Sequence, residues 1–247
     1  MKYHDEYRTV FASISRMVYN AENMLSTFYR VECNFLYGKT EFVSNAASTN
    51  SVIHKKPRGK RGKMLQHKGT NSIETLRLLL RRFEKSDAKD MFHNWAGDPE
   101  VCKYLSWGPH KNIGVTQIRI DSWRNQYNYE DTYVWAIELK SIHQPIGSIS
   151  VEISDDKAKT CEIGYCLSRP YWNQGIMTEA LRTVMRYLFY EIGYEKIIAK
   201  HDVLNPASGM VMQKAGMKFE KVLYQVSRRR DGTLCDCAVY AKNIWED

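Results

Sequence analysis

The stretch Cys161–Thr178, which reads CEIGYCLSRPYWNQGIMT, joins an apolar run to the beginning of a helix. The run ends in Ser-Arg-Pro, a short loop follows, and an amphipathic helical pattern starts directly after Gly175. The first amides of a helix lack partners within it, and the helix dipole favours negative charge at that end. Gly175 lets the backbone approach a ligand closely. The segment therefore predicts an anion site, and the expected anion is a diphosphate.

The patterns on either side predict an α+β domain with a mixed central sheet of about six to seven strands flanked by helices. Strands are expected where apolar residues alternate, and helices where they recur every three or four positions. The order of these elements differs from a repeated βαβ unit. The expected strands are 73–83, 133–139, 145–154, 160–167, 195–201, 217–226 and 235–242, and the expected helices are 86–95, 116–127, 176–192 and 206–215, with a short helical piece from Asp98.

The chain divides by composition into three parts. Residues 1–43 are expected to form an amphipathic helical extension, whose apolar face could pack on the body or on a second copy in a homodimer. Residues 44–71 are polar and then strongly basic, with Gly and Pro, which is typical of a flexible linker. Residues 72–247 carry the body of the protein.

Positive charge is concentrated ahead of the body. Residues 1–63 hold 11 of the 36 Lys and Arg residues but only 5 of the 28 Asp and Glu residues. The body is therefore nearly neutral, and charge gives no support for nucleic-acid binding by it. The run KKPRGKRGK at 55–63 could make a weak contact with RNA or a ribosome surface, or it could be a solvated tail.

Cysteine spacing and hydropathy bear on metal binding, redox setting and membrane association. The six cysteines form no C-x-x-C pair, and no His spacing completes a zinc site, so we expect no metal. Free thiols favour a reducing, cytoplasmic setting. No apolar run is long enough to span a bilayer, and the first residues lack the apolar centre of a signal peptide, so no membrane association is expected.

A second motif lies downstream of Gly175, where residues 204–220 read LNPASGMVMQKAGMKFE. Together with EIGYCLSRPYWNQGIMTEALRTVM at 162–185, it resembles the GNAT superfamily of acyl-CoA-dependent N-acetyltransferases. The family's phosphate loop is Gln/Arg-x-x-Gly-x-Gly/Ala, and Trp172, Gly175 and Met177 stand at its fixed positions in a form that looks like the Rim-type branch. That branch includes enzymes that acetylate N-termini of ribosomal proteins. The similarity covers about residues 72–244 and implies the GNAT fold.

The resemblance also implies how acetyl-CoA, the acyl donor, would be held. Leu167 would lie against the pantetheine arm, which would pair with the backbone as an added strand does. Asn205 would bond the pantetheine amides, although it could be a plain helix cap. Trp172 could instead be a surface aromatic packed on the loop. The residues expected around the diphosphate are Trp172, Asn173, Gln174, Gly175, Ile176, Met177 and Thr178.

Acetyl transfer to an amine requires a base, because the acceptor ammonium must lose a proton. We favour Glu162, which lies in the middle of an apolar strand, where burial would raise its pKa toward a useful value. An outward-facing Glu at a strand edge is the alternative, and Glu138 is a second candidate base. A backbone amide at the end of the strand 160–167 could stabilise the oxyanion.

The leaving thiolate also needs a partner. Many family members carry a Tyr at the position of Met212, whereas the Rim-type branch carries a Ser that corresponds to Ser208 here. A Ser hydroxyl is a poor acid, so we expect a hydrogen bond from Ser208 to the sulfur, with a helix-capping role as the alternative. Tyr165 and Tyr171 could serve instead. Cys166 has no His near it in sequence that would activate it as an acyl carrier.

The resemblance thus implies an N-acetyltransferase that acts by direct attack in a ternary complex, on a protein N-terminus or a small-molecule amine. Two alternatives stay open: a non-catalytic acyl-CoA-binding module, and a protein tethered to RNA or a ribosome through its basic segment. The expected walls of the acceptor side are Trp95, Tyr104–Trp107, Trp123 and Arg228–Arg230.

Overall fold

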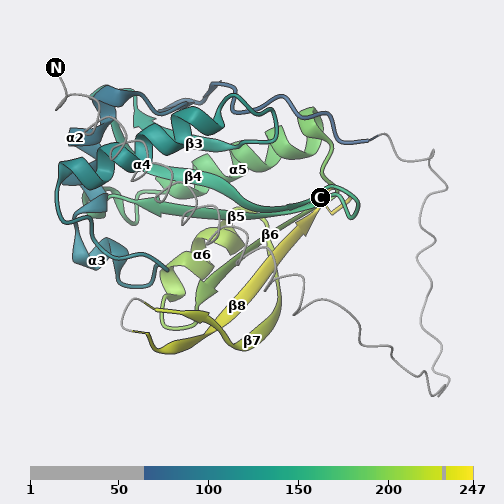
Figure 1. Ribbon diagram of the computed structural model, residues 1–247. Helices are drawn as coiled ribbons and strands as arrows, with labels where there is room; N and C mark the ends of the chain where they lie inside the picture. Colours follow the sequence, from purple (N-terminus) through teal and green to yellow (C-terminus); the bar gives the residue numbers. More distant parts are fainter. Residues whose placement is uncertain (1–63, 230–231, 247) are drawn as a thin grey trace, which may run out of the picture. The chain divides into compact units, whose positions relative to one another are not determined.

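One mixed sheet of eight strands organises residues 64–229 and 232–246, which this computed structural model describes (Figure 1). All neighbouring strands are antiparallel except β5 and β6, which run parallel. The order across the sheet is β1-β2-β3-β4-β5-β6-β8-β7. The strands are β1 (Ile73–Glu74), β2 (Leu78–Arg81), β3 (Val134–Leu139), β4 (Gln144–Asp155), β5 (Thr160–Leu167), β6 (Lys196–Asp202), β7 (Lys218–Arg228) and β8 (Leu234–Asn243).

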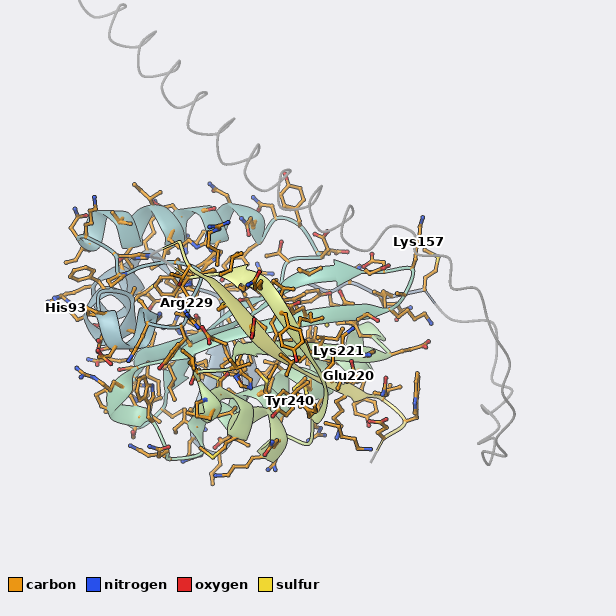
Figure 2. The ribbon with its side chains drawn as sticks, turned by 90° about the horizontal axis from the view of Figure 1, so that it is seen from below. His93, Lys157, Glu220, Lys221, Arg229 and Tyr240 are labelled. Atoms are coloured by element: carbon orange, nitrogen blue, oxygen red, sulfur yellow. The ribbon has the colours of Figure 1, made fainter. Side chains whose placement is uncertain are left out.

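Helices cover both faces of the sheet, and Figure 2 shows the sheet between two helical layers. The early helices form one layer, and α5 and α6 form the other. The early elements are η1 (Lys85–Asp87), α2 (Ala88–Met91), η2 (Phe92–Ala96), α3 (Pro99–Cys102) and α4 (Ile113–Gln126). The later ones are η3 (Arg169–Tyr171), α5 (Ile176–Tyr187), η4 (Leu188–Ile192) and α6 (Pro206–Lys214).

Two apolar clusters hold these layers together, one on each face of the sheet. The alternation of side chains along β5 assigns its residues to them. Cys161 and Ile163 pack in the cluster that contains the buried face of α5. Cys166 packs in the other cluster, with Trp95 and Ile120 of the early helices. Glu162, four residues before Cys166, therefore faces the early-helix side.

Strands β5 and β6 separate partway along their length. Their pairing covers only Thr160–Glu162 against Lys196–Ile198, and Glu162 with Ile198 is the last registered pair. Strand β5 continues to Leu167 and stays paired to β4, while β6 continues to Asp202 and stays paired to β8. The edge of β5 that faces β6 therefore has no strand partner beyond Glu162. At roughly 3.3 Å per residue, this open edge is about 16 Å long and ends at the loop before α5.

The α+β class, the mixed sheet and its flanking helices are confirmed, with corrections at three boundaries. The expected strand 73–83 is two strands, because Thr75 makes a tight turn through hydrogen bonds with Leu78, and the sheet has eight strands. The expected helix 86–95 consists of η1, α2 and the π-helical η2. The helix expected from 116 begins at Ile113, since the side chain of Asn112 accepts from the amide of Val115.

Residues 64–71, which we expected in the linker, lie packed on the body. The amide of Gln66 donates to the Ile192 carbonyl, and Thr70 is buried and donates to the Thr132 carbonyl. Residues 64–71 thus pack as part of the body, ahead of Ser72. The rest of the predicted linker and the predicted extension 1–43 lie outside the described residues. Within the described residues, no helix has the length and apolarity needed to cross a membrane.

Gly147 on β4 provides a test of the close approach between β4 and β5. A Cβ atom there would lie 2.5 Å from the backbone oxygen of Cys166, whereas one at Gly164 would meet the side chain of Glu152, which is exposed. We expect Gly147→Ala to lower the free energy of unfolding by about 1–3 kcal/mol, because backbone cannot move aside. Gly164→Ala should lower the free energy of unfolding by clearly less. Urea unfolding of both variants checks this, and equal losses would contradict it.

Candidate functional site

The loop between β5 and α5 presents backbone amides at the end of the open edge of β5. Asn173 and Gly175 both have positive φ, +59° and +73°, and Gly175 is the N-cap of α5. The first intrahelical bond runs from the Glu179 amide to the Gly175 carbonyl, so the amides of 176–178 have no acceptor within the helix. The side chains of Ile176, Met177 and Thr178 are buried. Their contribution at this site is therefore mainly their backbone amides.

Arg77, in the turn between β1 and β2, holds this loop from outside. Its Nη1 donates to the Gln174 carbonyl at 2.9 Å, and its Nε donates to the Glu179 carboxylate at 2.7 Å. Partial burial tends to raise the pKa of Glu179, but hydrogen bonds from Thr75 and Arg77 outweigh it, and the pKa is lowered. The helix start is thereby fixed with a guanidinium beside it. The sequence offered no local signal for Arg77, which lies almost a hundred positions upstream.

A groove of about 650 Å³ opens next to the same loop, along the exposed side of α5. Half of its lining residues are cationic, and its one acidic residue is already paired to Arg77. Such a surface attracts polyanions, and it is continuous with the helix N-terminus, which also favours negative charge. The lining residues are Arg77, Gly175, Thr178, Glu179, Arg182, Thr183, Arg186 and Lys214.

Tyr165 of β5 and Ser208 of α6 are in hydrogen-bond contact. The Tyr165 hydroxyl donates to the Ser208 carbonyl at 3.1 Å and shares a hydrogen bond with Ser208 Oγ at 3.0 Å. Burial raises the pKa of Tyr165 against a smaller opposing effect of the Ser208 bond, so the phenol stays protonated. Asn205 caps α6, its side chain accepting from the Ser208 amide at 3.4 Å. Met212 is buried in the core.

Trp172 and Leu167 contact each other directly. The indole Nε1 donates to the Leu167 carbonyl at 2.7 Å, and the Trp172 side chain stays partly exposed. This is the arrangement of an aromatic packed on its own loop, the alternative expected for Trp172. The indole N–H is already used within the loop, so the backbone amides after Gly175 are the better diphosphate donors.

Glu162 stands where β5 and β6 part, and it is paired with Lys200 of β6. The Lys200 ammonium lies 2.9 Å and 3.3 Å from the two carboxylate oxygens of Glu162. A second carboxylate, Glu152 of β4, lies over Gly164 on the same face and accepts from Ser150 Oγ at 2.5 Å. No local sequence pattern marks Glu152, since its proximity to β5 arises from strand pairing.

Glu138, the other candidate base, belongs to a buried ion-pair network. Its carboxylate accepts from Arg81 Nε at 2.6 Å, and the same guanidinium makes two hydrogen bonds to Asp87, at 2.7 Å and 2.9 Å. Strand β4 lies between Glu138 and β5. This arrangement ties the early helices to the sheet and gives Glu138 a structural role.

The expected walls of the acceptor side are only partly exposed. Trp95 itself is fully buried and belongs to the core, so only residues around it could line the acceptor side. Trp123 stacks on Phe83 with ring centroids 4.7 Å apart. Arg229, at the end of the β7–β8 hairpin nearest the early helices (Figure 2), binds the Asp202 carboxylate with two hydrogen bonds. Arg230 lies outside the described residues.

These features fit one kind of ligand. An unpaired strand edge can take an extended chain carrying amides, and the helix amides with their cationic rim can take phosphates at its end. Such a ligand needs the strand edge and the phosphate site one directly after the other. The strand β5 followed by the Gly175 loop provides this order. No group of three or more His, Cys, Asp or Glu side chains that could hold a metal ion occurs among residues 64–229 and 232–246.

Comparison with known proteins agrees with this architecture. The family model described as "Acetyltransferase (GNAT) domain" matches residues 77–218. The uncharacterised N-acetyltransferase YoaA of Bacillus subtilis is 30% identical over 169 residues, which is 68% of this chain and 94% of that protein. The ribosomal-protein-serine acetyltransferase of Escherichia coli is 31% identical over 99 residues, covering 40% of this chain and 55% of that protein.

A solved structure shares the fold. The Microcin C7 self-immunity acetyltransferase MccE, solved with acetyl-CoA and AMP, has a TM-score of 0.63 at 22% identity, covering 69% of this chain and 94% of that one. With the family model matching more than half of the sequence, the chain belongs to the GNAT family of N-acetyltransferases.

Proposed function

We propose that the protein transfers an acetyl group from acetyl-CoA to a primary amine by direct attack in a ternary complex. The observation that carries the proposal is the open edge of β5 that leads from Glu162 to the amides after Gly175. Bound acetyl-CoA would supply a reactive thioester. Leu167 and the preceding backbone would hold its pantetheine arm, and the residues around Gly175 its diphosphate, with Asn205 on the α6 side.

The chain's own groups account for the proton movements. Glu162, at the last pair between β5 and β6, receives a proton from the acceptor ammonium, directly or through a water. An amide on the unpaired edge of β5 stabilises negative charge on the acyl oxygen. Ser208 turns its hydroxyl proton from the Tyr165 phenol to the leaving sulfur, while the phenol keeps its hydrogen bond to the Ser208 carbonyl. Because Tyr165 remains protonated, the pair can supply a donor throughout the neutral pH range.

The Rim-type pattern around Trp172 and the similarity to the E. coli ribosomal-protein-serine acetyltransferase support a protein N-terminus as one acceptor class. Small-molecule amines form the second class. The direct test is thiol release from acetyl-CoA against N-terminal peptides, polyamines and aminoglycosides. Release with a member of the panel supports catalysis, whereas binding without release for every amine would favour a non-catalytic acyl-CoA-binding module.

Gly175→Val should weaken acetyl-CoA binding at least about tenfold, because a β-branched residue is strained at positive φ and the amide cradle would distort. The matched control is Gly193→Val, which also places a β-branched residue at positive φ, +98°, beyond the other end of the helix. Calorimetric titration of both folded variants gives the dissociation constants. Equal affinities in the two variants would refute a diphosphate site at Gly175.

Glu162→Gln should reduce kcat by about 10²-fold or more, since a general base is worth roughly that factor. Glu152→Gln and Glu138→Gln remove the other two carboxylates discussed above and should retain most of the turnover. Steady-state kinetics on all three variants, with circular dichroism as the control for folding, distinguishes them. A larger loss of kcat for Glu152→Gln than for Glu162→Gln would identify Glu152 of β4 as the base.

Cys166 should take no part in the reaction as an acyl carrier. Burial raises the pKa of its thiol to about 11, so at pH 8 the group is predominantly the neutral thiol. We expect Cys166→Ala to keep its turnover, and we expect no thioester on Cys166 when acid-quenched protein is analysed by mass spectrometry. An acetylated Cys166 would replace direct attack with a two-step mechanism.

A further inference from the structure

Lys200 occupies the position that an acceptor amine would need. It lies on β6 two residues beyond the last pair with β5, and its ammonium contacts both oxygens of the Glu162 carboxylate. The residue faces the early-helix side with Glu162, and about a third of its side chain is exposed. A lysine nitrogen is thus hydrogen-bonded to the proposed base, at the point where β5 and β6 separate.

The chain contains a similar pair that lacks this setting. Lys196, on the same strand, binds Glu220 of β7 at 2.7 Å, and its side chain is comparably exposed. Strand β6 is still paired with β5 at Lys196, which aligns with Thr160. The two lysines therefore lie on the same strand, each pairs with a Glu, and their side chains are similarly exposed. They differ in their distance from the open edge of β5.

We propose that Lys200 is a site of self-acetylation when the protein holds an acyl-CoA thioester. This inference rests on the proposed function, because it requires the thioester to lie along the open edge of β5. A nitrogen held beside both a base and a bound acyl group reacts as an intramolecular nucleophile, with a large advantage over lysines that meet the reagent from solution.

The step balances within the groups named. The Lys200 ammonium gives one proton to Glu162, and its lone pair forms a bond to the acyl carbon. The carbon–sulfur bond breaks with its electron pair on sulfur, and a second proton passes from nitrogen to the thiolate. The products are an uncharged amide at Lys200 and free CoA thiol. Acetylation would thereby remove the cation that pairs with Glu162.

Site-resolved mass spectrometry of the full-length protein incubated with acetyl-CoA, without added amine, tests the proposal. We expect Lys200 to be acetylated at least about tenfold faster than Lys196, at a rate independent of protein concentration, as proximity predicts. Acetyl phosphate, which has no CoA part, should label the two lysines at similar rates. Gly175→Val should slow labelling of Lys200 by acetyl-CoA and leave Lys196 unchanged.

The outcomes separate this inference from the proposed function. If the protein binds acetyl-CoA and acetylates an amine while Lys200 is labelled no faster than Lys196, self-acetylation is overturned and the proposed function stands. If Lys200→Arg does not abolish the fast-reacting site, the assignment to Lys200 is wrong. If calorimetry detects no binding of acetyl-CoA, both proposals fall.

Discussion

The loss of pairing between β5 and β6 beyond Glu162 is the constraint on which the rest of the site depends. Each strand keeps its other neighbour, β4 or β8, so the sheet remains whole while an internal edge opens. Backbone amides and carbonyls left without a partner are costly unless water or a ligand satisfies them. The fold therefore provides an extended polar edge in the interior of a sheet, and it ends at a helix N-terminus.

Charge and burial divide this edge into two functional ends. Arg77 fixes the loop before α5, and the groove that continues from it is lined by further cations, so the outer end suits phosphates. The inner end places Glu162 and Lys200 together on one face, with Tyr165 on the other face near Ser208. The proposed reaction uses one end for binding and the other for proton transfer.

Local patterns predicted much of this arrangement from sequence. The strand 160–167 and the helix after Gly175 lie where the apolar periodicity indicated, because each pattern is contained in one element. Contacts between distant segments could not be predicted in this way. Arg77 reaches Glu179 only after the chain folds, and Glu152 comes to Gly164 through strand pairing. The packing of residues 64–71 on the body likewise depends on tertiary contacts, which override a composition typical of a linker.

Hydrogen–deuterium exchange with and without acetyl-CoA is the most direct measurement of the central claim. The account predicts slower exchange at two places: the amides within residues 163–167 that point to the open edge of β5, and the amides of residues 176–178 at the start of α5. Amides of β3, which lies two strands away, should exchange at unchanged rates. Saturating acetyl-CoA that leaves both segments as exposed to exchange as in the free protein would contradict the account.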